Sequence, residues 1–314
     1  MQSSSRFPGN KRFAFTIFDD TDSSTVDLVR PVYDFLADLG IRSTKSVWAL
    51  NTDPGRRYAA STLQDSDYLN FILELKNYGF EIASHNMQNG DCPRERMDRG
   101  LSQFRELVGE YPRTHTNHLD NRENIYWGAY RFSSFTRQVA YSLGTHFRYA
   151  GRFAGHDPAS PFFWGDLCRE RVSYVRNFVF REINLDRVHK TLPYHDSTKP
   201  FVNHWFSSSD GGDVQQFCRM ISDPNQDRLE AESGVCIMYT HFASGFVRDG
   251  KLDPVFRRLM TRLASKDGWF VPVCTLLDRL REQHTDSNIS REELAVMENR
   301  WLRERLSLGR YFQR

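Results

Sequence analysis

The feature that most constrains the fold is a repeated alternation of short apolar runs with longer amphipathic segments. Residues 12–18 form an apolar, β-branched run that stops at an acidic cluster, residues 19–22. Residues 25–39 then repeat apolar side chains every three or four positions and end at Gly40, which predicts a helix and its stop. A strand followed by a helix and another strand predicts parallel βαβ units, whose ligand-binding loops lie at the C-terminal ends of the strands.

The same alternation continues along most of the chain. We expect further helices at 65–78 and 93–108, and further strands at 44–50, 80–84, 114–118, 145–149, 202–206, 235–240 and 269–273. Residues 151–200 follow no clear period and are interpreted as long loops with one helix. This arrangement predicts an α/β fold, a distorted (β/α)7-8 barrel over residues 1–284, followed by an amphipathic helical tail over 285–314.

Composition is consistent with a folded chain and excludes some partners. The 314 residues include 24 Phe and 13 Tyr, and 42 basic against 40 acidic residues leave a formal charge of +2. So small a charge gives no field to attract nucleic acid, and none is expected as a partner. Five cysteines without a C-x-x-C pair indicate reduced thiols. Without a secretory signal or a run of about 18 apolar residues, we expect a cytoplasmic protein with no transmembrane segment.

Metal-type and acid–base side chains follow four of the expected strands. They are Asp19 with Asp20, His85, His115 with His118, and His241. Because adjacent side chains diverge on a strand, one aspartate can hold a metal while its neighbour faces a substrate. An acidic turn is the plainer explanation of the aspartates. Four such clusters on one face of a barrel nevertheless favour an active site.

These positions resemble the polysaccharide deacetylase superfamily, also called the NodB-homology domain. Residues 15–20 (FTIFDD) resemble its T-F-D-D motif, and residues 79–85 (GFEIASH) resemble its G-x-E-I-x-x-H segment. Residues 205–213 (WFSSSDGGD) and 239–241 (YTH) stand where the family has an aspartate-bearing motif and a late histidine. The resemblance covers about residues 12–285. It implies a metal-dependent hydrolase that removes an N-acetyl or similar acyl group from a sugar or polysaccharide precursor.

The resemblance also implies a role for each matched residue. Asp19 would be the general base that takes a proton from water, and Asp20 would be a metal ligand. His85 would be a second metal ligand. His241 would be the general acid that protonates the departing amine.

One expected ligand of the family is missing. Asn89 occupies the second position of the family's H-x-x-x-H metal motif, and the family's R-x-P-[FY] motif is not recognisable near residues 114–118. His118 is the preferred replacement ligand, with His115 and the Asn89 amide as alternatives. One carboxylate and two imidazoles predict a single divalent ion, zinc first, with nickel, cobalt or manganese as alternatives.

Aromatic and acidic side chains near the expected mouth suit an acetylated carbohydrate substrate. Trp127 and Trp205 can stack on sugar faces, although buried packing is the commoner role of such residues, and Asp210 and Asp213 lie in the aspartate-bearing motif. Two other classes of function stay open. A non-catalytic carbohydrate-binding barrel is favoured by the missing histidine. A glycosidase that uses Asp19 and a distant carboxylate would leave the histidines without a role.

The end of the chain has a pattern of its own. Ser290 and Glu293 match a capping box. An apolar stripe follows, made of Leu294, Met297, Trp301, Leu302 and Leu306. We expect this stripe to pack on its own domain, with a homo-oligomer through this helix as the alternative. Six Arg against four Glu in residues 291–314 would attract anionic lipid only weakly.

Overall fold

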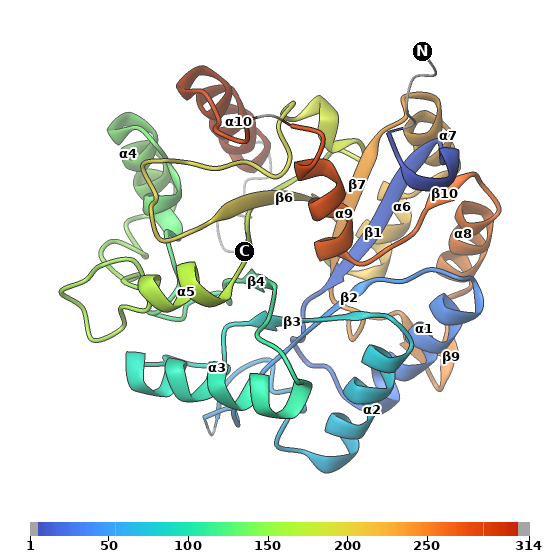
Figure 1. The fold of residues 1–314 in the computed structure, drawn as a ribbon, viewed down its shortest axis with the longest axis horizontal. Helices are drawn as coiled ribbons and strands as arrows, with labels where there is room; N and C mark the ends of the chain where they lie inside the picture. The colour runs from blue at the N-terminus through green and yellow to red at the C-terminus, as the bar shows by residue number, and fades with distance from the viewer. Residues whose placement is uncertain (1–5, 54, 285, 307–314) are drawn as a thin grey trace.

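Seven parallel strands close into a barrel that is surrounded by helices (Figure 1). The structure is a computed structural model that describes residues 6–53, 55–284 and 286–306. Strand order in the sheet follows the chain, and pairing of the first strand with the seventh closes the ring. The strands are β1 (Phe13–Asp19), β2 (Thr44–Val47), β3 (Glu81–His85), β4 (Thr114–Thr116), β5 (Tyr174–Phe180), β6 (His204–Asp210) and β7 (Val235–Thr240). The expected distorted (β/α) barrel is confirmed.

Helices follow most of these strands. They are α1 (Val26–Asp38), α2 (Ser66–Asn77), α3 (Arg94–Val108), α4 (Phe135–Gly144), α5 (Gly165–Arg171), α6 (Val214–Met220), α7 (Asp223–Ala231), α8 (Pro254–Ala264), α9 (Val273–Arg281) and α10 (Arg291–Leu306). Short elements complete the chain: the 3-10 helices η1 (Pro8–Asn10), η2 (Gly128–Arg131) and η3 (Leu185–Arg187), the hairpin β8 (Val247–Arg248) with β9 (Lys251–Leu252), and β10 (Gly268–Trp269), which pairs with β1. Among the helices described, none has the length and apolar character that crossing a bilayer requires.

The first βα unit shows how the sequence pattern becomes structure. Helix α1 buries Val29, Val32, Tyr33 and Leu36, the residues that recur at three- and four-residue spacing. Helix α3 ends as expected at Gly109, whose φ of 95° is a left-handed conformation that glycine adopts without steric cost. Helix α2 and strands β2, β3 and β7 likewise lie within the ranges expected from the sequence.

Two expectations between β4 and β6 are wrong. Residues 145–149 are not a strand, because His146 and Phe147 have φ values of 50° and 56° and the chain turns there after α4. The missing strand is β5, within the segment that was interpreted as loops. Its sequence, YVRNFVF, places the buried polar residues Arg176 and Asn177 between apolar ones, so neither a continuous apolar run nor a regular alternation marks it.

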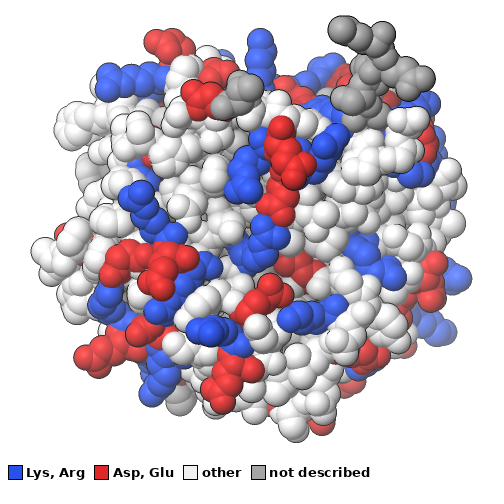
Figure 2. All heavy atoms as spheres, in the orientation of Figure 1, with Lys and Arg blue, Asp and Glu red and all other residues white. Residues whose placement is uncertain are grey.

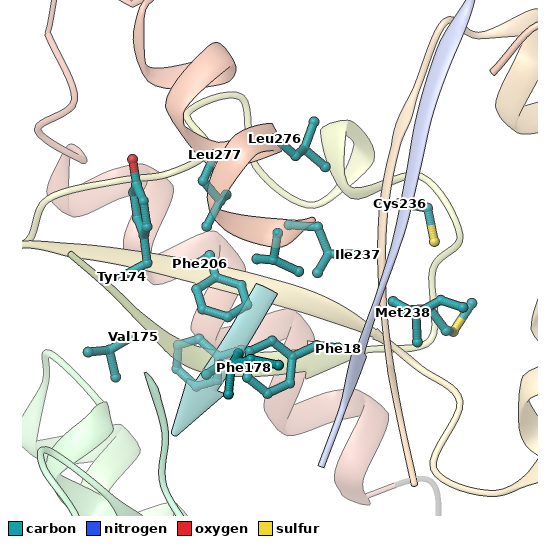
Figure 3. Close-up of a cluster of buried hydrophobic side chains, with 14 of the residues drawn as sticks. Phe18, Tyr174, Val175, Phe178, Phe206, Cys236, Ile237, Met238, Leu276 and Leu277 are labelled. Atoms are coloured by element: carbon teal, nitrogen blue, oxygen red, sulfur yellow. The ribbon is translucent and has the colours of Figure 1, made fainter. Parts of the chain in front are cut away.

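Large side chains fill the space around the sheet. Figure 3 shows residues of β1, β5, β6, β7 and α9 lying close together, among them Phe18, Phe178, Phe206 and Leu276. The rings of Phe18 and Phe206 are 6.1 Å apart, and all four side chains are fully buried. Elements from both halves of the chain therefore share one core, which holds the strand ends in fixed positions.

The C-terminal helix packs on the barrel. Rings of Phe132 and Phe178 lie 5.8 and 5.6 Å from the indole of Trp301. Four residues of the expected stripe are buried: Leu294, Met297, Trp301 and Leu302. Packing of this helix on its own chain is therefore confirmed, whereas the domain boundary at residue 284 stays a prediction, and the side chain of Leu306 and residues 307–314 lie outside the described part.

Charges of both signs are interspersed over the face seen in Figure 2. Many of them form surface ion pairs, such as Arg94 with Asp166 at 2.6 Å and Arg262 with Asp227 at 2.7 Å. Exposed pairs of this kind typically contribute at most about 1 kcal/mol each. Burial, rather than surface charge, dominates the stability of the fold.

Candidate metal and catalytic site

Residues from four strand ends converge at the C-terminal side of the barrel. Asp22 lies just after β1, His85 ends β3, His118 follows β4 and His241 follows β7. Ion-pair distances between 3.3 and 3.5 Å connect each of the three histidines to Asp22. The barrel thus gathers groups that are far apart in the sequence, as parallel strands ending on one face do.

Asp22, His85 and His118 have the arrangement of a metal site. Their ligand atoms lie within 4.8 Å of one another, and all three residues are buried. The Oδ1 atom of Asp22 is 3.3 Å from Nε2 of His85 and 3.3 Å from Nε2 of His118. Two ligands bound at about 2.0–2.1 Å to a tetrahedral zinc ion would be separated by about 3.3 Å.

Unsatisfied polar atoms within this cluster are consistent with a bound cation. Oδ1 of Asp22 and Nε2 of His118 are buried and form no hydrogen bond with any described residue. The other ring nitrogen of each histidine, Nδ1, has a hydrogen-bond partner. Nδ1 of His85 lies 2.7 Å from Oγ1 of Thr116, and Nδ1 of His118 lies 3.3 Å from Oδ1 of Asn121. Such outer contacts fix the tautomer that points the Nε2 lone pair at a metal. The donor set therefore fits a divalent ion.

Asp20 lies beside this cluster and pairs with an arginine. The Arg176 guanidinium donates to both carboxylate oxygens of Asp20, at 3.0 and 2.5 Å. Burial would raise the pKa of Asp20, but the charge and hydrogen bond of Arg176, together with the charges of His85 and His241, outweigh burial and lower the pKa. The nearer carboxylate oxygen is 3.9 Å from Nε2 of His85. The structure thus brings Asp22, instead of the expected Asp20, together with the two histidines, and a ligand role for Asp20 stays a prediction.

Asp19 lies on the side of β1 that faces α1. Its carboxylate is 2.9 Å from Nζ of Lys45, and it accepts hydrogen bonds from the Tyr33 hydroxyl at 3.0 Å and from the Phe242 N–H at 2.8 Å. Both members of the Asp19–Lys45 pair are fully buried. These contacts are those of a structural ion pair, and the role of Asp19 as general base stays a prediction.

His241 is placed to carry a proton. Its Nδ1 atom lies 2.8 Å from the Gly212 carbonyl oxygen, and its Nε2 atom lies 3.5 Å from Oδ2 of Asp22. Burial would lower the pKa of His241, but hydrogen bonding to the Asp22 carboxylate and its charge outweigh burial and raise the pKa to about 9. The Asp22 carboxylate therefore favours the protonated form of the ring.

The two alternative ligand positions have other partners. His115 lies outside the cluster, with Nδ1 2.8 Å from the Ser84 hydroxyl, and burial lowers its pKa to about 3. Asn89 donates its amide N–H to the carbonyl oxygen of Arg57 at 2.6 Å. Of the three candidates for the third ligand, the structure brings only His118 into the cluster.

Three of the four residues expected to bind substrate, Trp205, Trp127 and Asp213, make contacts outside this cluster. Trp205 is 1% exposed and packs against Tyr126, whereas Trp127 is half-buried under the Arg131 guanidinium, 3.7 Å from the ring centre. Asp213 caps α6 by accepting the Gln216 N–H, and Asp210 ends β6. These contacts give Trp205 and Asp213 structural roles, and substrate binding by all four stays a prediction.

Sequence reasoning missed Asp22, Arg176 and Lys45. Asp22 was visible in the acidic cluster after β1, but the matched motif has two consecutive aspartates and drew attention to the first pair. Arg176 lies in the strand that was not predicted. A lysine directly across from Asp19 in the β1–β2 register is a signal that requires knowledge of the strand pairing.

Asn89→Ala is expected to have a mild effect. The variant loses one hydrogen bond, which typically contributes about 0.5–1.5 kcal/mol, and no atom of the metal-type cluster. Denaturant unfolding and zinc titration of the metal-free protein would measure both quantities, with His118→Ala as the matched comparison. If Asn89→Ala loses zinc affinity and His118→Ala keeps it, residue 89 is the third ligand instead of His118.

Comparison with known proteins supports the fold. Neither a protein-family model nor a curated protein sequence matches the chain. Among solved structures, Puue allantoinase is 14% identical with a TM-score of 0.52, over 90% of this chain and 95% of its own. A protein from Mycobacterium smegmatis assigned to the polysaccharide deacetylases is 12% identical with a TM-score of 0.50, over 91% and 96% of the two chains.

A third structure, from Pseudomonas aeruginosa PAO1 and likewise assigned to the polysaccharide deacetylases, is 13% identical with a TM-score of 0.50. The alignment covers 89% of this chain and 94% of that one. Nearly the whole length is thus shared, although few residues are identical. The chain therefore has the fold of these solved structures, two of which are assigned to the polysaccharide deacetylases.

Proposed function

We propose that this chain is a metal-dependent hydrolase that removes an N-acetyl or similar acyl group from a sugar or polysaccharide precursor. The observation that carries the proposal is the buried cluster of Asp22, His85 and His118, with two unsatisfied ligand atoms, at the C-terminal face of a deacetylase-type barrel. Solved structures with this fold bear the names of deacetylases and of an allantoinase. The fold alone therefore leaves the substrate open, and the resemblance of residues 15–20 and 79–85 to polysaccharide deacetylase motifs favours a carbohydrate.

Each group of the site has a chemical task. Asp22, His85 and His118 would hold one divalent ion, zinc in the first instance. A bound ion of this kind polarises an acyl oxygen and lowers the pKa of water. Arg176 keeps the Asp20 carboxylate ionised and fixed in orientation, so Asp20 can accept a proton.

His241 completes the reaction on the opposite side of the cluster. Its raised pKa keeps a proton on the ring at neutral pH, and the Gly212 carbonyl fixes the ring orientation. The proton at Nε2 can pass to the amine as the C–N bond breaks. Asp19 is the alternative base, as the sequence motif implies, but Asp20 lies nearer the cluster, 3.9 Å from Nε2 of His85, whereas Asp19 faces Tyr33 of α1.

Acetate release tests this function. Protein stripped of metal by a chelator and then reloaded with zinc, cobalt, nickel or manganese is incubated with an N-acetylhexosamine, its oligomers and its nucleotide-linked form. We expect release from at least one of these compounds by reloaded protein, and none by stripped protein. A matched O-acetylated sugar distinguishes amide from ester substrates.

Two outcomes would contradict the proposal. Stoichiometric metal without release of any acyl group would favour the non-catalytic carbohydrate-binding barrel. If the protein retains none of the four ions after reloading, the proposed metal site is contradicted. A glycosidase would instead release reducing ends and leave the acetyl groups in place.

A further inference from the structure

Glu123 is a buried carboxylate that lies outside the metal-type cluster. It belongs to the loop between β4 and η2, beyond His118, and it is fully buried. Burial raises the pKa of Glu123 to about 7, although hydrogen bonds to the carboxylate act in the opposite direction. A carboxylate in such a place is costly unless donors surround it. Its donors come from the two loops that contain the histidines of the cluster.

The loop that follows β3 is attached to Glu123 near both of its ends. Asn86, directly after His85, donates a side-chain N–H to Oε1 of Glu123 at 2.7 Å. The main-chain N–H of Cys92 donates to Oε2 at 3.0 Å. Asn86 has a φ of 53°, a left-handed conformation that asparagine adopts more readily than most residues. Glu123 therefore holds the chain where it leaves the metal-type cluster at His85.

In the loop that follows β4, Asn121 connects Glu123 to His118. Its side-chain N–H groups donate to Oε1 of Glu123 at 2.8 Å and to the Gln88 carbonyl oxygen at 3.0 Å. Its Oδ1 atom accepts the Gly90 N–H at 3.2 Å and lies 3.3 Å from Nδ1 of His118. Both ends of the Asn121 amide are thus in use.

The Glu123 carboxylate fixes the orientation of this amide. An ionised carboxylate accepts hydrogen bonds and donates none. Turning the Asn121 amide over would place its oxygen against the Glu123 carboxylate and its NH₂ group against the Gly90 N–H. Oδ1 is therefore kept toward His118. An oxygen at that place accepts a hydrogen bond from a protonated Nδ1, which leaves the lone pair of the ring on Nε2 for a metal.

The main chain at Glu123 is held from a third segment of the chain. The indole N–H of Trp164 donates to the Glu123 carbonyl oxygen at 2.6 Å. A Cβ atom at Gly155 would lie 1.9 Å from the same oxygen, so only glycine permits this close approach. The carboxylate is therefore carried by a segment whose own position is fixed.

We propose that Glu123 is a positioning residue of the metal site. Its contacts with Asn86 and Asn121 hold the loops that follow β3 and β4, and the second contact selects the His118 tautomer that binds a metal. The inference rests on the proposed metal-dependent function and adds to it a residue that acts only through its neighbours. Removal of such an outer contact typically weakens metal binding by about 10–100-fold.

Zinc titration of the metal-free full chain is the first test. Glu123→Ala is expected to bind zinc about 10–100-fold more weakly than the wild type. Glu123→Gln is expected to lie between the two, because glutamine offers one acceptor oxygen where the carboxylate offers two. A competing chromophoric chelator measures each affinity.

Glu298→Gln is the matched control for this titration. Glu298 of α10 is also fully buried, and it accepts the Ser133 N–H at 2.7 Å and an N–H of Arg137 at 2.5 Å. These contacts join α10 to the start of α4 and involve no member of the metal-type cluster. The control is expected to lose stability and to keep the zinc affinity of the wild type.

The tautomer of His118 is the second test, and it requires no metal. Nitrogen NMR of metal-free protein with ¹⁵N-labelled histidine, at a pH where the ring is neutral, is expected to show only the Nδ1–H tautomer of His118 in the wild type. In Glu123→Ala, an Nε2–H population is expected as well. His118→Gln identifies the signals of this ring, and Glu298→Gln is expected to leave them unchanged. A purely structural role of Glu123 would not change the tautomer in folded protein.

Several results would overturn the proposal. Folded Glu123→Ala with either the zinc affinity or the single tautomer of the wild type would do so, as would an Nε2–H tautomer in the wild type. Equal weakening of zinc binding in Glu298→Gln would make the effect one of general stability. If Glu123→Ala does not fold, Glu123→Gln is judged by the same criteria. A wild type that binds no zinc contradicts the proposed function, and the tautomers of the metal-free proteins then decide the role of Glu123.

Discussion

Asp22→Ala is expected to abolish stoichiometric metal binding, whereas Asp20→Asn is expected to keep the metal and lose turnover. Asp22 is the one carboxylate in the three-residue cluster, with Oδ1 3.3 Å from both histidine nitrogens. Removing a direct ligand should cost more than the factor of about 10–100 in metal affinity that removal of an outer-shell partner typically costs. Two imidazoles alone would then hold the ion weakly.

Asp20 differs because its carboxylate is already bound at both oxygens by Arg176. Asn at this position keeps the shape but cannot accept the proton from water. Loss of general-base catalysis typically costs about 10²–10⁴ in rate. The histidines and Asp22 remain, so metal content should be unchanged.

Cobalt absorption spectra and elemental analysis of both variants measure this pair of expectations. Asp210→Ala is a suitable control, because Asp210 also ends a strand but lies outside the metal-type cluster. Metal retained by Asp22→Ala and lost by Asp20→Asn would restore the ligand assignment that the sequence motif implies. Equal metal content in all of the variants would contradict both assignments.

The strand ends of the site were predictable because βα periodicity is local. Apolar spacing in α1 and the short runs of β1, β3 and β7 are visible in single segments of the sequence. Parallel topology then places His85 and His241 on one face without any knowledge of side-chain contacts. For the same reason, His118 could be preferred over His115, since it follows the strand end.

Which aspartate lies with the two histidines could not be predicted, because that depends on a difference of one or two residues. Side chains alternate between faces along a strand, so a small shift of the strand end exchanges the inward and outward positions. Strand β1 continues through Asp19, which turns that side chain toward α1 and Lys45. Asp22 lies beyond the strand, where loop geometry decides the direction of a side chain.

Strand β5 and helix α4 were missed for a different reason. The strand contains Arg176. A charged residue in a short segment normally predicts an exposed position, but Arg176 is buried. It is accommodated only because Asp20, 156 residues earlier in the sequence, neutralises it. A surface helix normally has a polar exposed face, whereas the exposed face of α4 is apolar, so its sequence lacks the usual amphipathic pattern.

Lys45→Met is expected to destabilise the fold by about 3–5 kcal/mol, because it leaves the buried Asp19 carboxylate without its cation. The ammonium lies 2.9 Å from Asp19 and donates to the Ser24 hydroxyl at 3.1 Å, and neither member of the ion pair is exposed. Burial alone would lower the pKa of Lys45, but the charge and hydrogen bond of Asp19, with smaller contributions from Tyr68 and Asp20, outweigh burial and raise the pKa. Lys45 is therefore cationic at neutral pH, and it lies 2.9 Å from the Asp19 carboxylate.

Urea unfolding of a double-mutant cycle measures this dependence. Lys45→Met and Asp19→Asn should each be strongly destabilising, and the double variant should be less destabilised than the sum of the two. Lys11→Met is the control, because the exposed pair of Lys11 and Asp267 at 2.8 Å should contribute at most about 1 kcal/mol. Additive effects in the cycle would contradict a direct interaction between Lys45 and Asp19.

The same variants separate the structural role of Asp19 from a catalytic one. Lys45→Met keeps the Asp19 carboxylate, whereas Asp19→Asn removes its charge, and both are assayed where the protein is folded and loaded with metal. If Asp19 is structural, the two folded variants should retain turnover to a similar extent. A loss of about 10²–10⁴ in kcat for Asp19→Asn alone, with metal retained, would instead make Asp19 the base and leave Asp20 as the partner of Arg176.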